Sequence, residues 1–126
     1  MSTDAVHLIP TSNTPEVHLN PNGTIKIKGR AIDENRARYS NQIMTWIDSY
    51  LIKPAKTTEV TISLEYLNSY NSIILASILK KLSEVKQQSK SLVIRWFIES
   101  DDEDMLERGQ YISSSLNLPI EFVITD

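Results

Sequence analysis

The sequence lacks several features on which common protein sites are built. It contains no cysteine, which excludes a disulfide scaffold, a thiolate zinc site, an iron–sulfur cluster and a cysteine nucleophile. Its three glycines, Gly23, Gly29 and Gly109, stand too far apart to form a glycine-rich loop that holds phosphate. Its two histidines, His7 and His18, lack the spacing of a zinc-protease motif. We therefore expect no metal site and no bound cofactor.

An excess of basic charge and a long apolar run are also missing. Thirteen basic and 16 acidic residues give a net charge of −3, so we expect no broad basic face and no nucleic-acid partner. No apolar run is long enough to cross a bilayer, and Met1–Asp4 has neither the basic flank nor the apolar stretch of a signal peptide. We expect a cytoplasmic protein with no membrane partner.

The composition is that of a globular domain. The 126 residues are 40% hydrophobic, which is enough to bury one core without a metal or disulfide. No linker, repeat or low-complexity segment interrupts the chain, so we expect residues 1–126 to form one domain. The first sixteen residues are rich in Thr, Ser, Asn and Pro and predict loop or extended chain, and the composition leaves open whether residues 1–7 are ordered.

The hydrophobic periodicity predicts an α/β fold. Residues 17–28 read as a β-hairpin around Asn22–Gly23, a turn pair in which both positions tolerate positive φ. Helix and strand patterns then alternate, which favours parallel strands joined by right-handed crossovers in a mixed sheet with helices packed on it. The expected order is a helix over 39–51, a strand over 58–64, a helix over 69–85, a strand over 92–98, a helix over 101–116 and a strand over 120–124.

Three expectations concern packing. Residues 92–98 are apolar except for Arg95, a pattern typical of a strand covered on both faces, and Arg95 then needs either a carboxylate partner, such as Glu65 or Glu34, or an exposed edge. Trp46 and Trp96 fall on apolar-patterned elements and are expected in the core. The acidic run 99–104 is expected to cap the third helix rather than to bind calcium. The apolar side of that helix is expected to hold Met105, Leu106, Tyr111, Ile112 and Leu116.

The junction between the strand over 58–64 and the helix that follows is the most informative stretch. Asn68 or Ser69 can cap the helix by accepting a hydrogen bond from a free backbone N–H group. The hydroxyl of Ser69 would also lie at the carboxyl end of a strand, where open α/β sheets place their sites. A phosphate there would meet the positive end of the helix dipole and add a charge of about −1.5 to −2. Capping alone and capping with phosphorylation are both compatible with the residues.

An ordered set of short motifs resembles the SiaC family of bacterial regulatory phosphoproteins, from about Leu8 to the C-terminus. The motifs are Thr14–Val17, the hairpin ending at Gly29, Glu34–Asn35, Tyr66–Ser69 and Leu92–Trp96. The resemblance implies a fold similar to STAS domains. It also implies a non-enzymatic partner-switching protein, phosphorylated by a cognate Ser/Thr kinase and dephosphorylated by a PP2C-type phosphatase. The unmodified form would bind an effector such as a diguanylate cyclase.

The resemblance also implies which residues act. The family's phospho-acceptor is a threonine after Tyr-Leu-Asn, and Ser69 stands at that position. Asp33–Glu34–Asn35 departs from the family's Pro-Glu-Asn, which puts the exact partner set in doubt, and the residues leave open whether Ser72 or Tyr70 is modified instead. The expected partner-binding residues are Asn68, Ser69, Tyr70 and Ser72, with the exposed side of their helix.

Two other hypotheses remain from the residues. One is a small enzyme or ligand-binding domain that uses a strand-end crevice near Ser69, with Tyr66, Glu65 and Asn68 as its polar groups. A triad of His18, Asp33 and a serine can be written, but no nucleophile-elbow motif supports it. The other is a scaffold protein that is never phosphorylated.

Overall fold

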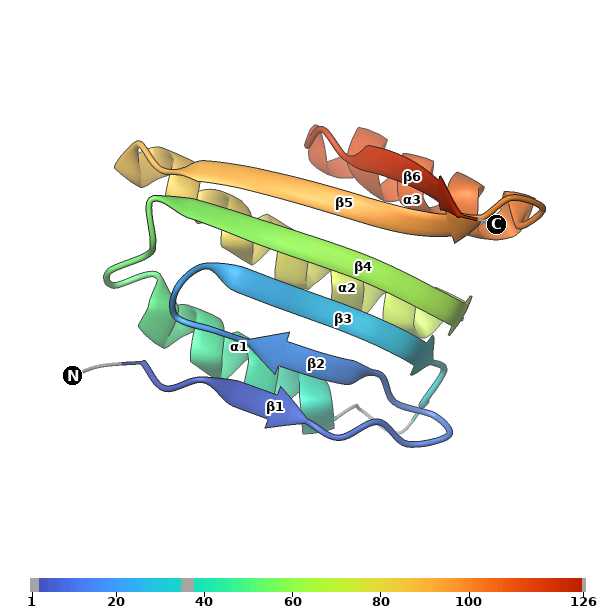
Figure 1. The fold of residues 1–126 in the computed structure, drawn as a ribbon, viewed down its shortest axis with the longest axis horizontal. Coiled ribbons are helices and arrows are strands. Elements are labelled where there is room, and N and C mark those ends of the chain that lie inside the picture. Colours follow the sequence, from blue (N-terminus) through green and yellow to red (C-terminus); the bar gives the residue numbers. More distant parts are fainter. Residues whose placement is uncertain (1–2, 35–37, 126) are drawn as a thin grey trace.

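The computed structural model describes residues 3–34 and 38–125, which form a six-stranded sheet and a layer of helices (Figure 1). None of the helices described is both long and apolar enough to span a membrane. The elements are β1 (Val6–Leu8), β2 (Glu16–Leu19), β3 (Thr24–Ala31), α1 (Arg38–Tyr50), β4 (Thr57–Leu67), α2 (Ser69–Leu82), the 3₁₀ turn η1 (Ser83–Gln88), β5 (Ser91–Glu99), α3 (Glu103–Leu116) and β6 (Glu121–Thr125).

The strands lie side by side in chain order, from β1 at one edge to β6 at the other. β1, β2 and β3 pair antiparallel, and β3, β4, β5 and β6 pair parallel, which confirms the predicted hairpin and the mixed sheet. Crossovers of one hand that always step in the same direction place every connecting helix on the same side of a sheet. Accordingly, α1, α2 and α3 cover one face, and the opposite face has no helix of the described chain over it (Figure 1).

The hairpin turn differs in detail from the prediction. The Gly23 amide donates to the Asn20 carbonyl at 2.9 Å, and the Thr24 amide donates to the Asn22 side chain at 2.9 Å. Of the Asn22–Gly23 pair, whose two positions both tolerate positive φ, only Gly23 adopts it, at +105°. A Cβ at Gly23 would lie 2.2 Å from the Thr57 carbonyl oxygen, so glycine is required by both the turn and the neighbouring strand.

Strand β1 was not predicted, because three residues are too short to show an alternating pattern. Its pairing with β2 places His7 in the sheet, although the composition had left the order of residues 1–7 open. Two contacts hold the chain before β1 against α1. The Trp46 indole donates to the Asp4 carbonyl at 2.7 Å, and the Thr3 and Ser49 hydroxyls are 3.0 Å apart.

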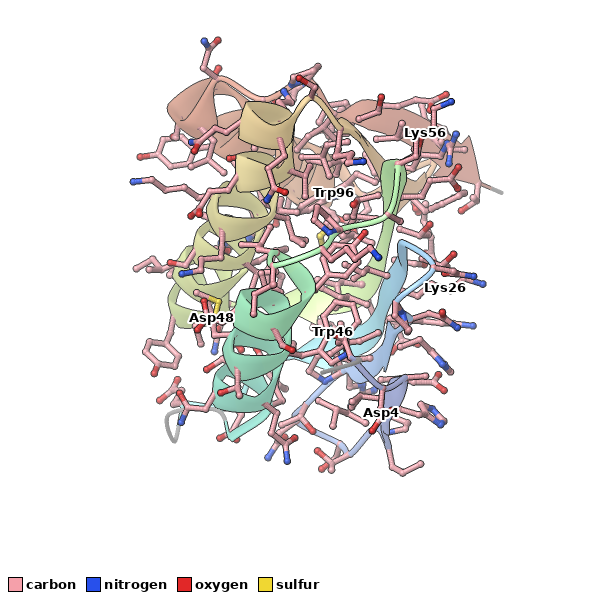
Figure 2. The ribbon with its side chains drawn as sticks, turned by 90° about the vertical axis from the view of Figure 1, so that its left-hand side faces the viewer. Asp4, Lys26, Trp46, Asp48, Lys56 and Trp96 are labelled. Atoms are coloured by element: carbon pink, nitrogen blue, oxygen red, sulfur yellow. The ribbon has the colours of Figure 1, made fainter. Side chains whose placement is uncertain are left out.

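The two faces of the sheet differ sharply in exposure. On the helix side Ile62 and Trp96 are 0% exposed, and Trp46 is also buried, which confirms that both tryptophans belong to the core. Side chains on the other side extend away from the helices into solvent, as Lys26 does in Figure 2. The expectation that the strand over 92–98 is covered on both faces is therefore wrong, because every crossover helix lies on the same side.

Arg95 lies on this open face. It contacts Glu121 at 3.1 Å and Glu59 at 3.6 Å, so neither expected partner is the observed one. Glu65 instead pairs with Arg30 at 3.3 Å. The observed partners are the residues that the parallel register brings beside β5 on the same face, and this register cannot be read from one strand alone.

Helix α3 has the predicted cap, and four of the five residues expected on its apolar side do pack against the core, namely Met105, Leu106, Ile112 and Leu116. The Asp102 side chain accepts a hydrogen bond from the Met105 amide at 3.1 Å, which confirms the capping role of the acidic run. The buried residues are Met105, Gly109 and Ile112, and the placement of Tyr111 on the apolar side is wrong, because it is 75% exposed. A Cβ at Gly109 would lie 2.6 Å from Phe122 and 3.0 Å from Trp96, so the helix packs on the sheet through its glycine.

Candidate functional site

The first turn of α2 follows directly on the end of β4. Asn68 is the N-cap, and its side-chain oxygen accepts a hydrogen bond from the Asn71 amide at 2.9 Å. Ser69 is the first helical residue. Of the two caps that the sequence allowed, the structure therefore uses Asn68, which leaves the Ser69 hydroxyl out of the capping role.

A buried set of amide hydrogen bonds supports this turn. Asn71 is 1% exposed, and its Nδ2 donates to the Asn68 side chain at 2.8 Å and to the Asp33 carbonyl at 2.9 Å. Asn68 Nδ2 in turn donates to the Ile32 carbonyl at 3.0 Å. The start of α2 is thus tied to the chain that leaves β3, and we call Tyr39, Asn68 and Asn71 the supporting network.

Tyr39 completes the supporting network from α1. Its hydroxyl donates to the Asn71 side-chain oxygen. Burial raises the pKa of the Tyr39 phenol far above its ordinary value, and the nearby Asp33 and Tyr70 act in the same direction. The phenol therefore stays neutral and keeps its proton to donate. Buried polar groups that are all paired make a turn rigid, so this turn is a fixed platform.

The three candidate acceptor residues differ in accessibility. Ser69 is exposed, and its hydroxyl has no hydrogen-bond partner within the part of the chain that the structure describes. Ser72 is half-buried, and its hydroxyl donates to the Asn68 carbonyl at 3.0 Å and accepts from Arg108 Nη1 at 3.3 Å. Tyr70 is 39% exposed. Within the described residues neither the Ser69 nor the Tyr70 hydroxyl has a hydrogen-bond partner, so of the two serines Ser69 is the one whose hydroxyl is open to solvent and unbonded.

An open groove of about 590 Å³ separates the first turns of α2 from α3. Its apolar side chains are unusually exposed, with Ile73 at 68% and Tyr111 at 75%. Its lining comprises Ser69, Ser72, Ile73, Asp104, Glu107, Arg108, Tyr111 and Ile112. The sequence analysis had placed only the α2 side of this groove. The sequence held one signal for the groove. The run Ile73–Leu75 has three consecutive apolar residues, and one buried face of a helix does not need all three.

The polar groups expected to share a strand-end crevice do not all meet. Glu65 and Tyr66 line a second hollow, of about 630 Å³, with Lys28, Phe97 and Glu99. Ser69 lines the α2–α3 groove instead. The parallel strands follow one another without a reversal of order, so they lack the switch point at which open α/β sheets form a ligand crevice.

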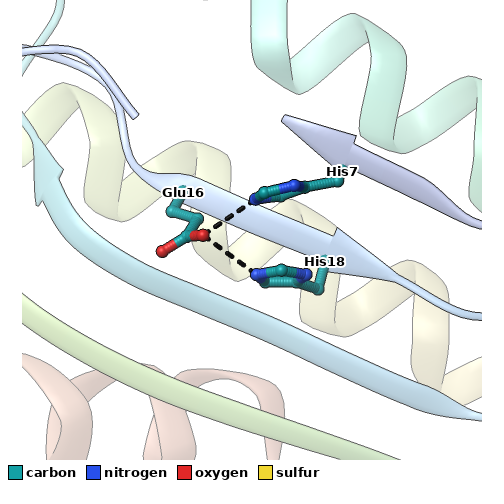
Figure 3. A group of neighbouring side chains, drawn as sticks. All are labelled: His7, Glu16 and His18. Atoms are coloured by element: carbon teal, nitrogen blue, oxygen red, sulfur yellow. Dashed lines mark hydrogen bonds and ion pairs between the residues drawn. The ribbon is translucent and has the colours of Figure 1, made fainter. Parts of the chain in front are cut away.

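A separate cluster of titratable side chains lies on the open face of the sheet (Figure 3). Nε2 of His7 and Nε2 of His18 lie 2.8 and 3.0 Å from the same Glu16 oxygen, and the two rings stack at 4.1 Å. Hydrogen bonds from His7 and His18 lower the pKa of the Glu16 carboxyl. The sequence analysis expected no metal site because His7 and His18 lack a zinc-protease spacing, and it otherwise considered His18 only in a triad with Asp33 and a serine. It did not bring His7 beside His18, because β1 showed no strand pattern.

Comparison with known proteins relates the whole arrangement to one family. A family model described as SiaC family regulatory phosphoprotein matches residues 8–125. An uncharacterised protein of Pseudomonas aeruginosa strain UCBPP-PA14 is 23% identical over 115 residues, covering 90% of this chain and 91% of the relative.

Solved structures of similar fold come from the same organism. The crystal structure of apo-SiaC from Pseudomonas aeruginosa matches with a TM-score of 0.80 and 23% identity over all of both chains. A chain in the crystal structure of the diguanylate cyclase SiaD in complex with its activator SiaC matches with a TM-score of 0.85 and 21% identity, covering 95% of this chain and 99% of that chain. These likenesses agree with the observed order of strands and helices.

Proposed function

Because this chain belongs to the SiaC family of regulatory phosphoproteins, we propose that it is a non-enzymatic partner-switching protein with Ser69 as its phospho-acceptor. A cognate Ser/Thr kinase adds the phosphate, and a PP2C-type phosphatase removes it. The observation that carries this proposal is the exposed hydroxyl of Ser69 at the first position of α2, which has no hydrogen-bond partner among the described residues. A kinase needs such a hydroxyl within reach, and the one at Ser72 is already held by two hydrogen bonds.

The docking surface for the partners is the groove between α2 and α3 with the residues around its mouth. It would use Asn68, Ser69, Tyr70 and Ser72, as the sequence analysis expected, and Ile73 and Tyr111, whose exposed apolar surface favours burial against a partner. Exposed aromatic side chains of this kind are enriched at protein interfaces. The supporting network keeps this surface in one shape while partners exchange.

Phosphorylation would change this surface without unfolding it. The phosphate adds a charge of about −1.5 to −2 beside Asp104 and Glu107, which line the same groove. Arg108 and the free amides at the start of α2 would hold the phosphate in place. A partner that buries Ile73 and Tyr111 would then have to desolvate the held dianion, so the effector dissociates from the phosphorylated form.

The effector is proposed to be a diguanylate cyclase, which would place the protein in cyclic di-GMP signalling in the bacterial cytoplasm. Support comes from the matching chain whose structure was solved with the diguanylate cyclase SiaD, of which SiaC is the activator. The unmodified form would bind the cyclase and raise its activity.

Phosphate mapping tests the acceptor. We expect mass spectrometry after incubation with the cognate kinase and ATP to find phosphate on Ser69 in the native chain and none on Ser69→Ala. Ser72→Ala is the matched control, because it removes a neighbouring hydroxyl of the same turn, and it should still be modified on Ser69. Phosphate found only at other positions contradicts the proposal.

Affinity for the effector tests the switch. Ser69→Ala should stay folded and bind the effector with or without kinase, whereas the phosphorylated native chain should lose binding. Ser69→Glu should lose binding only in part, because a carboxylate has less charge and fewer acceptor oxygens than a phosphate. Equal affinity of the modified and unmodified chains would rule out a switch at this surface.

A further inference from the structure

We propose that His7, Glu16 and His18 form a binding site for a divalent transition-metal ion of the zinc type on the open face of the sheet. Two imidazole nitrogens and one carboxylate oxygen are a known protein donor set for Zn²⁺, with a fourth position left for water. The three donor atoms lie within 4.8 Å of one another. The inference does not depend on the phospho-switch, because the cluster lies on the face opposite to α2.

The backbone brings the three side chains together. His7 and His18 are directly opposite each other in the antiparallel register of β1 and β2, and opposed residues project their side chains to the same face. Glu16 precedes His18 by two positions in β2, so it also projects to that face. The three donors therefore sit on paired strands rather than on a loop, which limits how far they can move apart.

The side chains are already close to a coordination geometry. Ligands at about 2.0–2.2 Å from a tetrahedral ion lie roughly 3.4 Å from each other, and the two Nε2 atoms are 2.8 and 3.0 Å from the Glu16 oxygen. Small side-chain rotations would open enough space for the ion. Each Nε2 now faces the carboxylate, and in the bound form its lone pair would face the metal, with the ring proton on Nδ1.

The solvent exposure, the donor atoms and the neighbouring charges of the cluster determine which ions can bind to it. The imidazoles are 45% exposed and the carboxylate 29%, so the ion has direct access from solvent. Imidazole donors suit Zn²⁺, Cu²⁺ and Ni²⁺, whereas Mg²⁺ and Ca²⁺ require oxygen ligands. Lys26 and Lys28 lie opposite His18 and Glu16 in the next strand, and their positive charges oppose the binding of a cation.

A bound ion would fasten β1 to the sheet. β1 has three residues and lies at the edge, and its three residue pairs with β2 are the fewest between neighbouring strands of the described sheet. Metal ligands on both strands would lower the rate at which β1 detaches. A ligand that binds only the folded chain also raises the melting temperature in proportion to the logarithm of its concentration.

The test is calorimetric titration of the full chain with Zn²⁺, with any affinity tag removed because the chain has two histidines of its own. We expect one ion bound per chain. Single variants His7→Ala, His18→Ala and Glu16→Gln should each weaken Zn²⁺ binding by at least about tenfold, since loss of a group that merely orients a ligand already costs that much. Glu59→Gln removes another exposed carboxylate of the same face and should leave Zn²⁺ affinity unchanged.

Imidazole nitrogen resonances provide a readout that does not depend on variants. Zn²⁺ should shift the Nε2 signals of both histidines, whereas Mg²⁺ should shift neither. Absence of stoichiometric Zn²⁺ binding, or equal Zn²⁺ affinity in the native chain and the three cluster variants, would overturn the proposal and leave the cluster as a hydrogen-bonded cross-strand contact.

Discussion

The two faces of the sheet differ in how tightly their side chains are packed, although the same strands form both faces. Trp96 is fully buried under α3, and Arg95, the residue before it in β5, is 37% exposed between two carboxylates. On the covered face even one added atom would clash with a neighbouring side chain, as a Cβ at Gly109 would. On the open face water replaces whatever is removed. The free energy of unfolding therefore depends mainly on the covered face. Residues on the open face can form a polar cluster such as His7–Glu16–His18 without disturbing the core.

The largest expected effect is a difference in the free energy of unfolding between variants of Trp96 and Arg95, which are adjacent in β5. Trp96→Ala should lower the free energy of unfolding by about 3–5 kcal/mol, because it leaves a cavity under α3. Arg95→Ala should change it by less than about 1 kcal/mol, because exposed ion pairs contribute little. Urea unfolding followed by circular dichroism measures both. Similar losses in the two variants would contradict the contrast between the faces.

A second comparison tests whether buried polar groups on the covered side also stabilise the fold. Asn71→Ala should lower the free energy of unfolding by about 2–4 kcal/mol, because it leaves buried partners such as the Tyr39 hydroxyl unpaired. Asn41 is an exposed asparagine of α1, and Asn41→Ala should change the same quantity by less than about 0.5 kcal/mol. If urea unfolding finds no difference between them, the supporting network does not stabilise the start of α2.

The smallest effect is expected from an exposed ion pair in the helix layer. The hydrogen bond from Lys81 to Asp48, 2.8 Å long, raises the pKa of the Lys81 ammonium above 10.5. A raised pKa in the folded state gives a contribution that is fully present below 10.5 and is lost as pH rises through the folded value.

Lys81→Gln should therefore unfold at slightly lower urea concentration than the native chain at pH 7, and this difference should vanish at strongly alkaline pH. Lys80→Gln, which changes the preceding exposed lysine, is the control and should match the native chain at both pH values. A Lys81→Gln difference that grows with pH would show that the ion pair is not its cause.

Most of the fold could be predicted because its signals are local. The hairpin, the alternation of helices and strands and both buried tryptophans follow from periodicity over short windows. The errors lie where distant elements meet. β1 was missed because three residues have no period, Tyr111 was misplaced because Gly109 rather than a large side chain faces the sheet, and the partners of Arg95 depend on strand register.

The residues of the candidate sites also divide into those that a local pattern predicts and those that only contacts between distant elements bring together. Asn68 and Ser69 could be found because a cap and a helix start are adjacent in the chain, and the resemblance to the family pointed to the same turn. Arg108, Ile73 and Tyr111 join that turn only through the packing of α3 against α2. His7 joins Glu16 and His18 only through the pairing of β1 with β2.

The amino-acid sequence by itself determined the order of helices and strands from β2 to β6, the capped start of α2 and the exposed hydroxyl at that start, because each depends on residues close together in the chain. Only the tertiary structure decided which face of the sheet stays open, which residues form the groove beside Ser69 and which donors gather around Glu16. These depend on contacts between residues far apart in the chain, and such contacts are set by the packing of the whole sheet and its helices rather than by any local pattern.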